Sequence, residues 1–180
     1  MVAAANRRWR GRLAARFAVT QGDQFQALLA GPEALWDLLH WLRAELRGAG
    51  AGAGTEAEWI IACGRGPITT PLAATAPEVD GPCFHLAGSA LEAAKRQRLV
   101  LAFGGYDPVV DAFARYYSAL YWSWTVRQRE VASALRLGDR AALPRRLRVT
   151  RSAVSHVASR IGWRLVEAAD AEFRRRLAER

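Results

Sequence analysis

The first half of the chain combines two kinds of apolar periodicity. Apolar residues that alternate with small or polar ones on both sides of a Gly-Asp pair predict a β-hairpin over residues 16–29. Apolar positions at three- and four-residue steps predict helices over residues 33–46 and 84–97. Continuous apolar runs predict strands over residues 58–63 and 98–103. The order hairpin, helix, strand, helix, strand indicates an α+β sheet with helices on one face.

Three further features of this half are local. Residues 6–15 predict a short helix in which Trp9 and Leu13 lie one turn apart among arginines. It is either a surface helix with two apolar anchors or a helix that contacts a membrane surface or phosphates. Residues 48–54 alternate Gly and Ala, which predicts a loop. His40 lies at the edge of a leucine stripe, so we expect a packed core residue rather than a ligand.

The second half has helical periodicity without a strand pattern. The stretch from Asp107 to about Leu137 predicts one long apolar-periodic helical region that joins the two halves, with its aromatic residues used for packing. The tail from residue 167 onward has mixed charges and predicts an exposed helix. We therefore expect an α+β domain over residues 1–106 and a helical linker with a second domain over residues 107–180.

Residues 139–165 predict a helix-turn-helix, with a first helix over 141–147, a turn over 148–150 and a second helix over 151–161. Two residues depart from the usual pattern. Pro144 implies that the first helix begins there or is distorted, and Arg148 occupies the usual turn glycine position. The apolar residues of the second helix and its continuation are expected to face inward: Val154, Val157, Ala158, Ile161 and Leu165. An ordinary helical pair with solvated arginines is the alternative.

Positive charge changes this picture. The chain of 180 residues carries a formal charge of +9, and Lys95 is its single lysine among 26 basic residues. Such an arginine bias is partly what a GC-rich codon composition gives. The excess is nevertheless concentrated, with +5 over residues 1–16, +7 over residues 136–164 and −3 over the 119 residues between. Local concentration of charge favours an anionic partner.

Composition also excludes several classes of protein. No run approaches the roughly 20 apolar residues that cross a bilayer, and no apolar segment of a secretory signal follows the first arginines. Cys63 and Cys83 are too few for a disulfide scaffold or a zinc site. We expect a soluble protein of the reducing cytoplasm.

Five short motifs are spread over nearly the whole chain: Phe17-x-Val19-Thr20-x-Gly22-Asp23-x-Phe25-Gln26, Ile68-Thr69-Thr70, Asp80-Gly81-Pro82-x-Phe84-His85-x-Ala87, Ala90-Leu91-x-x-Ala94-Lys95 and Trp124-Thr125-x-x-Gln128-x-Glu130. Together they resemble the SatD family. The resemblance implies a ferredoxin-like, nucleotide-cyclase-like or GGDEF-like antiparallel sheet with helices on one face, followed by an all-α helix-turn-helix region. It identifies an architecture rather than a reaction.

The same resemblance implies a missing strand. In the family, a first strand bearing an aspartate precedes the helix expected over residues 6–15, and here residues 1–5 alone precede it. An internal gap in a sheet would leave backbone groups unpaired. Three explanations stay open: the start was assigned too late, the N-terminal residues reorganise, or a partner chain supplies the strand.

Asp23 at the hairpin tip is the candidate metal ligand, for Mg²⁺ with a nucleotide, although a turn aspartate also stabilises its own turn. Gln24 stands where the Gly-Asp-Glu-Phe motif has a carboxylate, and the strand with the other aspartate is absent, so catalysis is the poorer expectation. The candidate ligand-binding residues of the α+β domain are Gly22, Asp23, Gln24, Arg65, His85 and Lys95.

The helix-turn-helix supplies the leading functional hypothesis. Base contacts are expected from the start of the second helix, from Arg151, Ser152, Ser155 and His156. Phosphate contacts are expected from Arg145, Arg146, Arg148, Arg160 and Arg164. The hypothesis is a cytoplasmic regulator of transcription that binds duplex DNA, whose non-catalytic first domain senses a ligand or mediates association, for instance in a homodimer. The alternatives are a nucleotide-binding or phosphoryl-transfer domain that uses Asp23, and an adaptor that recruits a partner strand.

Overall fold

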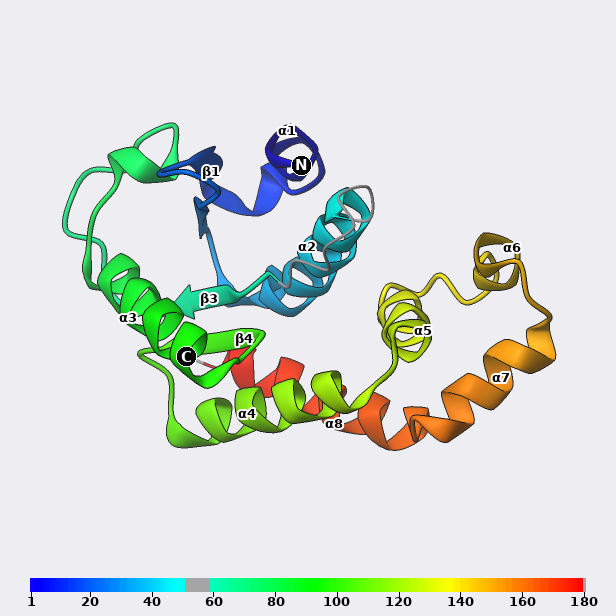
Figure 1. The fold of residues 1–180 in the computed structure, drawn as a ribbon. Coiled ribbons are helices and arrows are strands. Elements are labelled where there is room, and N and C mark those ends of the chain that lie inside the picture. Colours follow the sequence, from blue (N-terminus) through cyan, green and yellow to red (C-terminus); the bar gives the residue numbers. More distant parts are fainter. Residues whose placement is uncertain (51–58, 180) are drawn as a thin grey trace.

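A computed structural model of the chain describes residues 1–50 and 59–179 and shows a mixed α+β protein (Figure 1). The elements of the first half are α1 (Val2–Arg8), β1 (Leu13–Val19), β2 (Phe25–Leu29), α2 (Leu35–Gly50), β3 (Ile61–Gly64), α3 (Pro82–Gln97) and β4 (Leu101–Gly104), with 3-10 turns at Arg10–Arg12, Pro32–Ala34 and Ala76–Glu78. Those of the second half are α4 (Pro108–Ser123), α5 (Val126–Arg136), α6 (Leu143–Leu147), α7 (Arg151–Arg160) and α8 (Trp163–Ala178). Within the described residues, no helix is both long enough and apolar enough to cross a membrane.

The strands form two separate pairs, so the described residues do not build the single antiparallel sheet that was expected. The hairpin pairs β1 with β2 in antiparallel register, and β3 pairs with β4 in parallel, with Ile61 opposite Leu101. The parallel pairing follows from the connection, because α3 carries the chain back to the starting end of β3 before β4 begins. The loop expected over residues 48–54 begins as the last turn of α2 as far as Gly50, and its remainder lies outside the described residues.

Helices cover both faces of the parallel pair, which corrects the expectation of one covered face. A Cβ atom on Gly64 would lie 1.8 Å from the carbonyl oxygen of Cys83, and one on Gly104 would lie 2.3 Å from that of Leu86. These two strand glycines therefore let α3 approach the backbone of the pair closely. Leu101 and Phe103 lie on the other face of β4 from Gly104 and pack in one apolar cluster with residues of α4 and α8.

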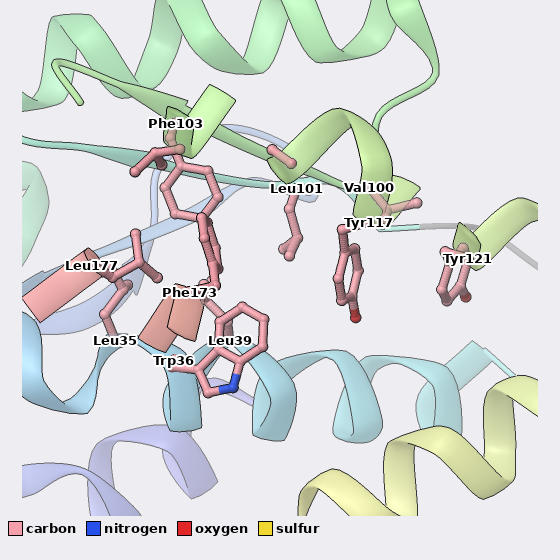
Figure 2. Packing of buried hydrophobic residues seen from close by; sticks show 12 residues of the cluster. Leu35, Trp36, Leu39, Val100, Leu101, Phe103, Tyr117, Tyr121, Phe173 and Leu177 are labelled. Atoms are coloured by element: carbon pink, nitrogen blue, oxygen red, sulfur yellow. The ribbon is translucent and has the colours of Figure 1, made fainter. Parts of the chain in front are cut away.

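The largest apolar cluster of the described residues contains side chains from both halves of the chain, before and after the expected boundary between residues 106 and 107. Figure 2 shows Phe103 of β4, Trp36 of α2 and Phe173 of α8 converging on its centre. The ring of Phe173 stacks on Phe113 of α4 at 3.8 Å between centroids, and Leu177 is 1% exposed. The prediction of an exposed tail is therefore wrong, because the apolar stripe of α8 completes the core.

The N-terminal helix lies earlier in the chain than expected. It spans Val2–Arg8 rather than residues 6–15, and Leu13 begins β1 instead of ending a helix. Trp9 remains an anchor, since its ring meets Trp41 of α2 edge to face at 6.3 Å. The Asn6 side chain bonds both backbone groups of Phe17, so the outer edge of β1 is covered within the chain.

The long helical joint is broken by a capping box. α4 ends at Ser123, and Thr125 starts α5 by accepting a hydrogen bond from the backbone N–H of Gln128, whose side chain accepts one in return from the N–H of Thr125. Trp124 between the two helices is buried against Ile161 and Trp163. Tyr117, Tyr121 and Trp124 of this joint thus serve packing, as expected, whereas Tyr116 is exposed.

Candidate functional site

The helix-turn-helix prediction matches the elements that the structure places at α6 and α7. Pro144 stands in the first turn of α6, where its missing N–H is harmless, and Arg148 ends that helix in the left-handed conformation with φ 52° and ψ 46°. Thr150 then caps α7, because its Oγ1 accepts a hydrogen bond of 3.1 Å from the N–H of Ala153. Both departures from the usual sequence pattern are therefore accommodated.

One face of α7 is buried and the other is polar. Val154 packs with Val131 and Ala134 of α5 and with Leu143 of α6, while Ala158 belongs to the neighbouring cluster with Trp163. Leu165 does not extend this inner face as expected, since Gly162 breaks the helix at φ 62° and the Leu165 side chain is 79% exposed. The polar residues of α7 are all exposed: Arg151, Ser152, Ser155, His156, Ser159 and Arg160.

The residues predicted to contact phosphates lie mostly just before and just after α7 in the sequence. Arg145, Arg146, Arg148 and Arg164 are exposed, and Arg164 follows the break at Gly162 and belongs to α8. Arg146 pairs with Asp139 at 2.7 Å. Among the described residues, no carboxylate pairs with five of the predicted contacts: Arg145, Arg148, Arg151, Arg160 and Arg164. We call the exposed side chains of α6, the turn and α7 the basic α6–α7 surface.

The hairpin tip is a solvent-exposed turn. Gln24 donates its N–H to the carbonyl oxygen of Gln21 at 2.9 Å, and Gly22 adopts φ 57°, which the first central position of such a turn requires. Asp23 and Gln24 are both exposed, and no group of three or more potential metal ligands occurs among the described residues. The Mg²⁺-nucleotide site at Asp23 therefore stays a prediction, without a second ligand from this part of the chain.

The other ligand-site candidates have separate partners. The Arg65 guanidinium lies 5.7 Å from the centre of the Tyr106 ring. His85 Nε2 lies 3.2 Å from Asp80 Oδ1, and Lys95 bonds Glu92 at 2.6 Å. His85 and Lys95 are ten positions apart on α3, which amounts to roughly 15 Å along a helix axis. The structure does not bring them together in one pocket.

Two of the short motifs meet at the start of α3. The N–H groups of Thr69 and Thr70 donate to the carbonyl oxygen of Asp80 at 3.0 and 3.3 Å, and the N–H of Asp80 donates to Thr70 Oγ1 at 2.8 Å. A Cβ atom on Gly81 would lie 2.6 Å from the carbonyl oxygen of Pro67. These residues therefore cross-link the loop after β3 to the first turn of α3, which is a structural role.

Sequence reasoning missed a polar pocket between α2, α4 and α5. The lining residues are His40, Arg43 and Arg47 of α2, Tyr117 and Tyr121 of α4, Trp124 just after α4, and Arg129, Ser133 and Arg136 of α5. The signal was present, because an amphipathic core helix rarely places His and two Arg on neighbouring turns beside its leucine stripe.

Buried charge accompanies this pocket. Arg136 Nε donates to Asp170 Oδ2 of α8 at 2.6 Å, with 5% and 10% of the two side chains exposed. Burial raises the pKa of Asp170 above its ordinary value, although Arg136 opposes that shift. Burial and the charges of Arg136 and Arg43 lower the pKa of His40 well below its ordinary value, so its imidazole is neutral.

Comparison with known proteins gives no match, whether to a family model, a curated protein or a solved structure.

Proposed function

We propose that the chain is a DNA-binding protein in which α6, the turn and α7 form the helix-turn-helix. One observation supports this above all others: α7 buries Val154 and Ala158 and turns its whole polar face to solvent. A helix packed on an apolar side and basic on the other can enter the major groove without unfolding its own core. Figure 1 shows α6 and α7 at the end of the molecule away from the β1–β2 hairpin, which leaves this surface uncovered by the α+β part.

The division of contacts follows from position on the helix. The N-terminal part of a recognition helix contacts bases, which assigns base contacts to Arg151, Ser152, Ser155 and His156. Residues that flank it meet the phosphate backbone, which assigns Arg145, Arg146, Arg148, Arg160 and Arg164 to phosphates. A role in regulation of transcription in the cytoplasm is part of the same proposal.

The first half of the chain is proposed as a non-catalytic domain that senses a ligand or mediates association. The contact between residues 68–70 and Asp80 supports the view that these motifs form one unit, as the resemblance to the SatD family implies. A cyclase-like origin of that half remains part of the proposal. Homodimer formation is a further proposal. Capture of a partner strand is another, and it would have to use a sheet edge other than β1 at Phe17, which Asn6 already occupies.

The test is binding to a pool of random duplex DNA, measured by fluorescence anisotropy at several salt concentrations. We expect affinity to fall steeply with salt, because bound phosphates release counterions. The variant R151A/R160A should bind at least about tenfold more weakly, because a lost base contact costs about 1–3 kcal/mol and a lost phosphate contact weakens binding to every sequence. The control R96A/R115A removes the same charge from exposed positions outside the helix-turn-helix and should bind like the wild type. Absent or salt-insensitive binding, or an equal loss in both variants, would overturn the proposal.

A further inference from the structure

A second basic surface lies at the start of the chain, and the helix-turn-helix does not use it. It consists of five exposed arginines on α1, the 3-10 turn and β1: Arg7, Arg8, Arg10, Arg12 and Arg16. Residues 1–16 contain no acidic residue, and none of the described carboxylates pairs with any of these side chains. We call this set the N-terminal basic surface.

Exposed arginines in other parts of the chain are often neutralised by a carboxylate. Such pairs lie on α4, α5 and α8 and join Arg115 to Asp111, Arg127 to Glu130 and Arg175 to Glu172. The N-terminal arginines lack this compensation, so their positive charge acts on the solvent around them. Uncompensated charge of one sign raises the local concentration of ions of the opposite sign, which favours an anionic partner.

Three of these side chains, Arg7, Arg10 and Arg12, have no partner among the described residues. They lie close together in the sequence, so their Cα atoms span at most roughly 18 Å, over which one strand of duplex DNA carries about five phosphates. A Cβ atom on Gly11 would meet no other atom within 4 Å, so the turn between Arg10 and Arg12 is open to solvent on that side. The three guanidinium groups can therefore reach one phosphate backbone together.

The other two arginines of the surface are held in place by uncharged groups. The Cζ atom of Arg8 lies 5.8 Å from the ring centres of both Trp9 and Trp41. Arg16 Nε donates to the carbonyl oxygen of Ala74 at 3.2 Å. Both guanidinium groups keep their full charge, and a fixed orientation lowers the entropy cost of binding an anion.

The inward side of α1 distinguishes between the possible anionic partners. Val2, Ala4 and Ala5 pack in the apolar cluster with α2, which leaves α1 without the exposed apolar face that a membrane-binding helix inserts among lipids. Trp9 packs against Trp41, so it offers no ring on which the bases of a single strand could stack. Arginines without exposed apolar neighbours fit the phosphate backbone of a duplex best.

We propose that the N-terminal basic surface binds the phosphate backbone of duplex DNA without reading its bases. Figure 1 shows α1 beside β1 and α2, whereas α6 and α7 lie beyond α5 at the other end of the molecule. One chain can therefore hold two separate stretches of duplex, one at each end. This second step rests on the proposed function of α6 and α7, but the phosphate contact at the N-terminal basic surface does not.

The test counts duplexes per chain. A random-sequence DNA duplex of about one helical turn, roughly 34 Å, is titrated into the whole chain at low salt, and native mass spectrometry gives the number bound at saturation. The variant R7Q/R10Q/R12Q should bind one duplex per chain fewer than the wild type, whether or not α6 and α7 bind. In the R151A/R160A variant, the affinity of the remaining site should fall with salt at a logarithmic slope of about −2 to −3, as three phosphate contacts predict.

Two further variants make the result specific. R96Q/R115Q/R175Q removes the same charge from exposed positions outside both basic surfaces and should bind as many duplexes as the wild type. R7K/R10K/R12K keeps the charge and should also keep the wild-type count, which separates lost charge from damage to α1.

The same measurements separate this proposal from that for α6 and α7. If R7Q/R10Q/R12Q binds as many duplexes as the wild type, or if R96Q/R115Q/R175Q loses as many, the proposal for the N-terminal basic surface is overturned. It is also overturned if R7Q/R10Q/R12Q keeps its duplexes but loses binding to phosphatidylserine vesicles, because the surface is then a membrane contact. If R151A/R160A alone leaves the count and affinity unchanged, the helix-turn-helix proposal fails and the N-terminal contact stands.

Discussion

The side-chain amide of Asn6 binds both backbone groups of Phe17. Asn6 Nδ2 donates to the Phe17 carbonyl oxygen at 2.9 Å, and Asn6 Oδ1 accepts from the Phe17 N–H at 2.8 Å. A primary amide offers the same donor and acceptor as a peptide group, so α1 continues the hydrogen bonding of β1 without being a strand. Next to it, the Arg16 N–H donates to the carbonyl oxygen of Ala74 at 3.1 Å.

Replacing Asn6 by Ala should therefore destabilise the protein. The substitution leaves a half-buried N–H and C=O of β1 unsatisfied, which costs about 1–3 kcal/mol of unfolding free energy. Urea denaturation followed by circular dichroism measures the change. The control Q21A alters an exposed side chain of the hairpin turn and should stay within about 0.5 kcal/mol of the wild type. Equal stability of both variants would mean that water replaces the amide at this edge.

A second prediction concerns pH and His40. Its pKa is lowered in the folded protein by burial and by Arg136 and Arg43, so the unfolded chain binds a proton below about pH 6.5 that the folded protein does not. Stability is thus complete above that pH and falls as the pH drops toward the lowered pKa. The slope attributable to this one residue approaches about 1.4 kcal/mol per pH unit.

The H40Q variant isolates this effect. Its unfolding free energy should change less steeply between pH 7 and pH 5 than that of the wild type, because the glutamine does not titrate. H156Q replaces an exposed histidine of α7 and should keep the wild-type slope. Denaturant titrations at each pH give the slopes, and identical slopes for H40Q and the wild type would contradict a neutral buried imidazole.

Local signals predicted much of this fold. The hairpin over residues 16–29, the leucine stripe of α2 and the capped second helix at Thr150 each follow from chemistry within a few residues. The pairing of the strands does not follow from local chemistry. Nothing in the sequence of β3 and β4 distinguishes two strands of a separate parallel pair from two strands of one large sheet. The N-terminal helix was misplaced because residues 10–12 form a 3-10 turn and Leu13 pairs with Leu29 in the hairpin, a contact that local periodicity does not indicate.

The candidate sites divide in the same way. Exposure of Arg151 and Ser155 followed from helical periodicity, because Val154 and Ala158, one turn apart, fix which face of α7 is buried. The polar pocket between α2, α4 and α5 could not be predicted from sequence, since His40 and Arg129 line one pocket only because α2 packs beside α5. Long-range packing is therefore the part that sequence patterns leave open.

The turn residue Arg148 permits a prediction that separates stability from DNA binding. A side chain in the left-handed region costs about 1 kcal/mol, and glycine avoids most of that cost. R148G should raise the unfolding free energy by about 0.5–1 kcal/mol while weakening DNA binding through loss of a phosphate contact. R148K keeps both the charge and the strain, so it should match the wild type in both measurements. Denaturation and fluorescence anisotropy test the pair, and a destabilised R148G would contradict the left-handed turn.

The last prediction contrasts two apolar residues of α8, Phe173 and Leu165. Phe173 stacks on Phe113 and contacts Phe103, so F173A should open a cavity in the main core and cost about 3–5 kcal/mol. Leu165 is 79% exposed, so L165A should change stability by no more than about 0.5 kcal/mol. The two substitutions lie on one helix and both yield alanine, which cancels any effect of helix propensity beyond a few tenths of a kcal/mol. Urea denaturation of both variants decides between a packed and a solvated α8, since a solvated helix would make the two losses equally small.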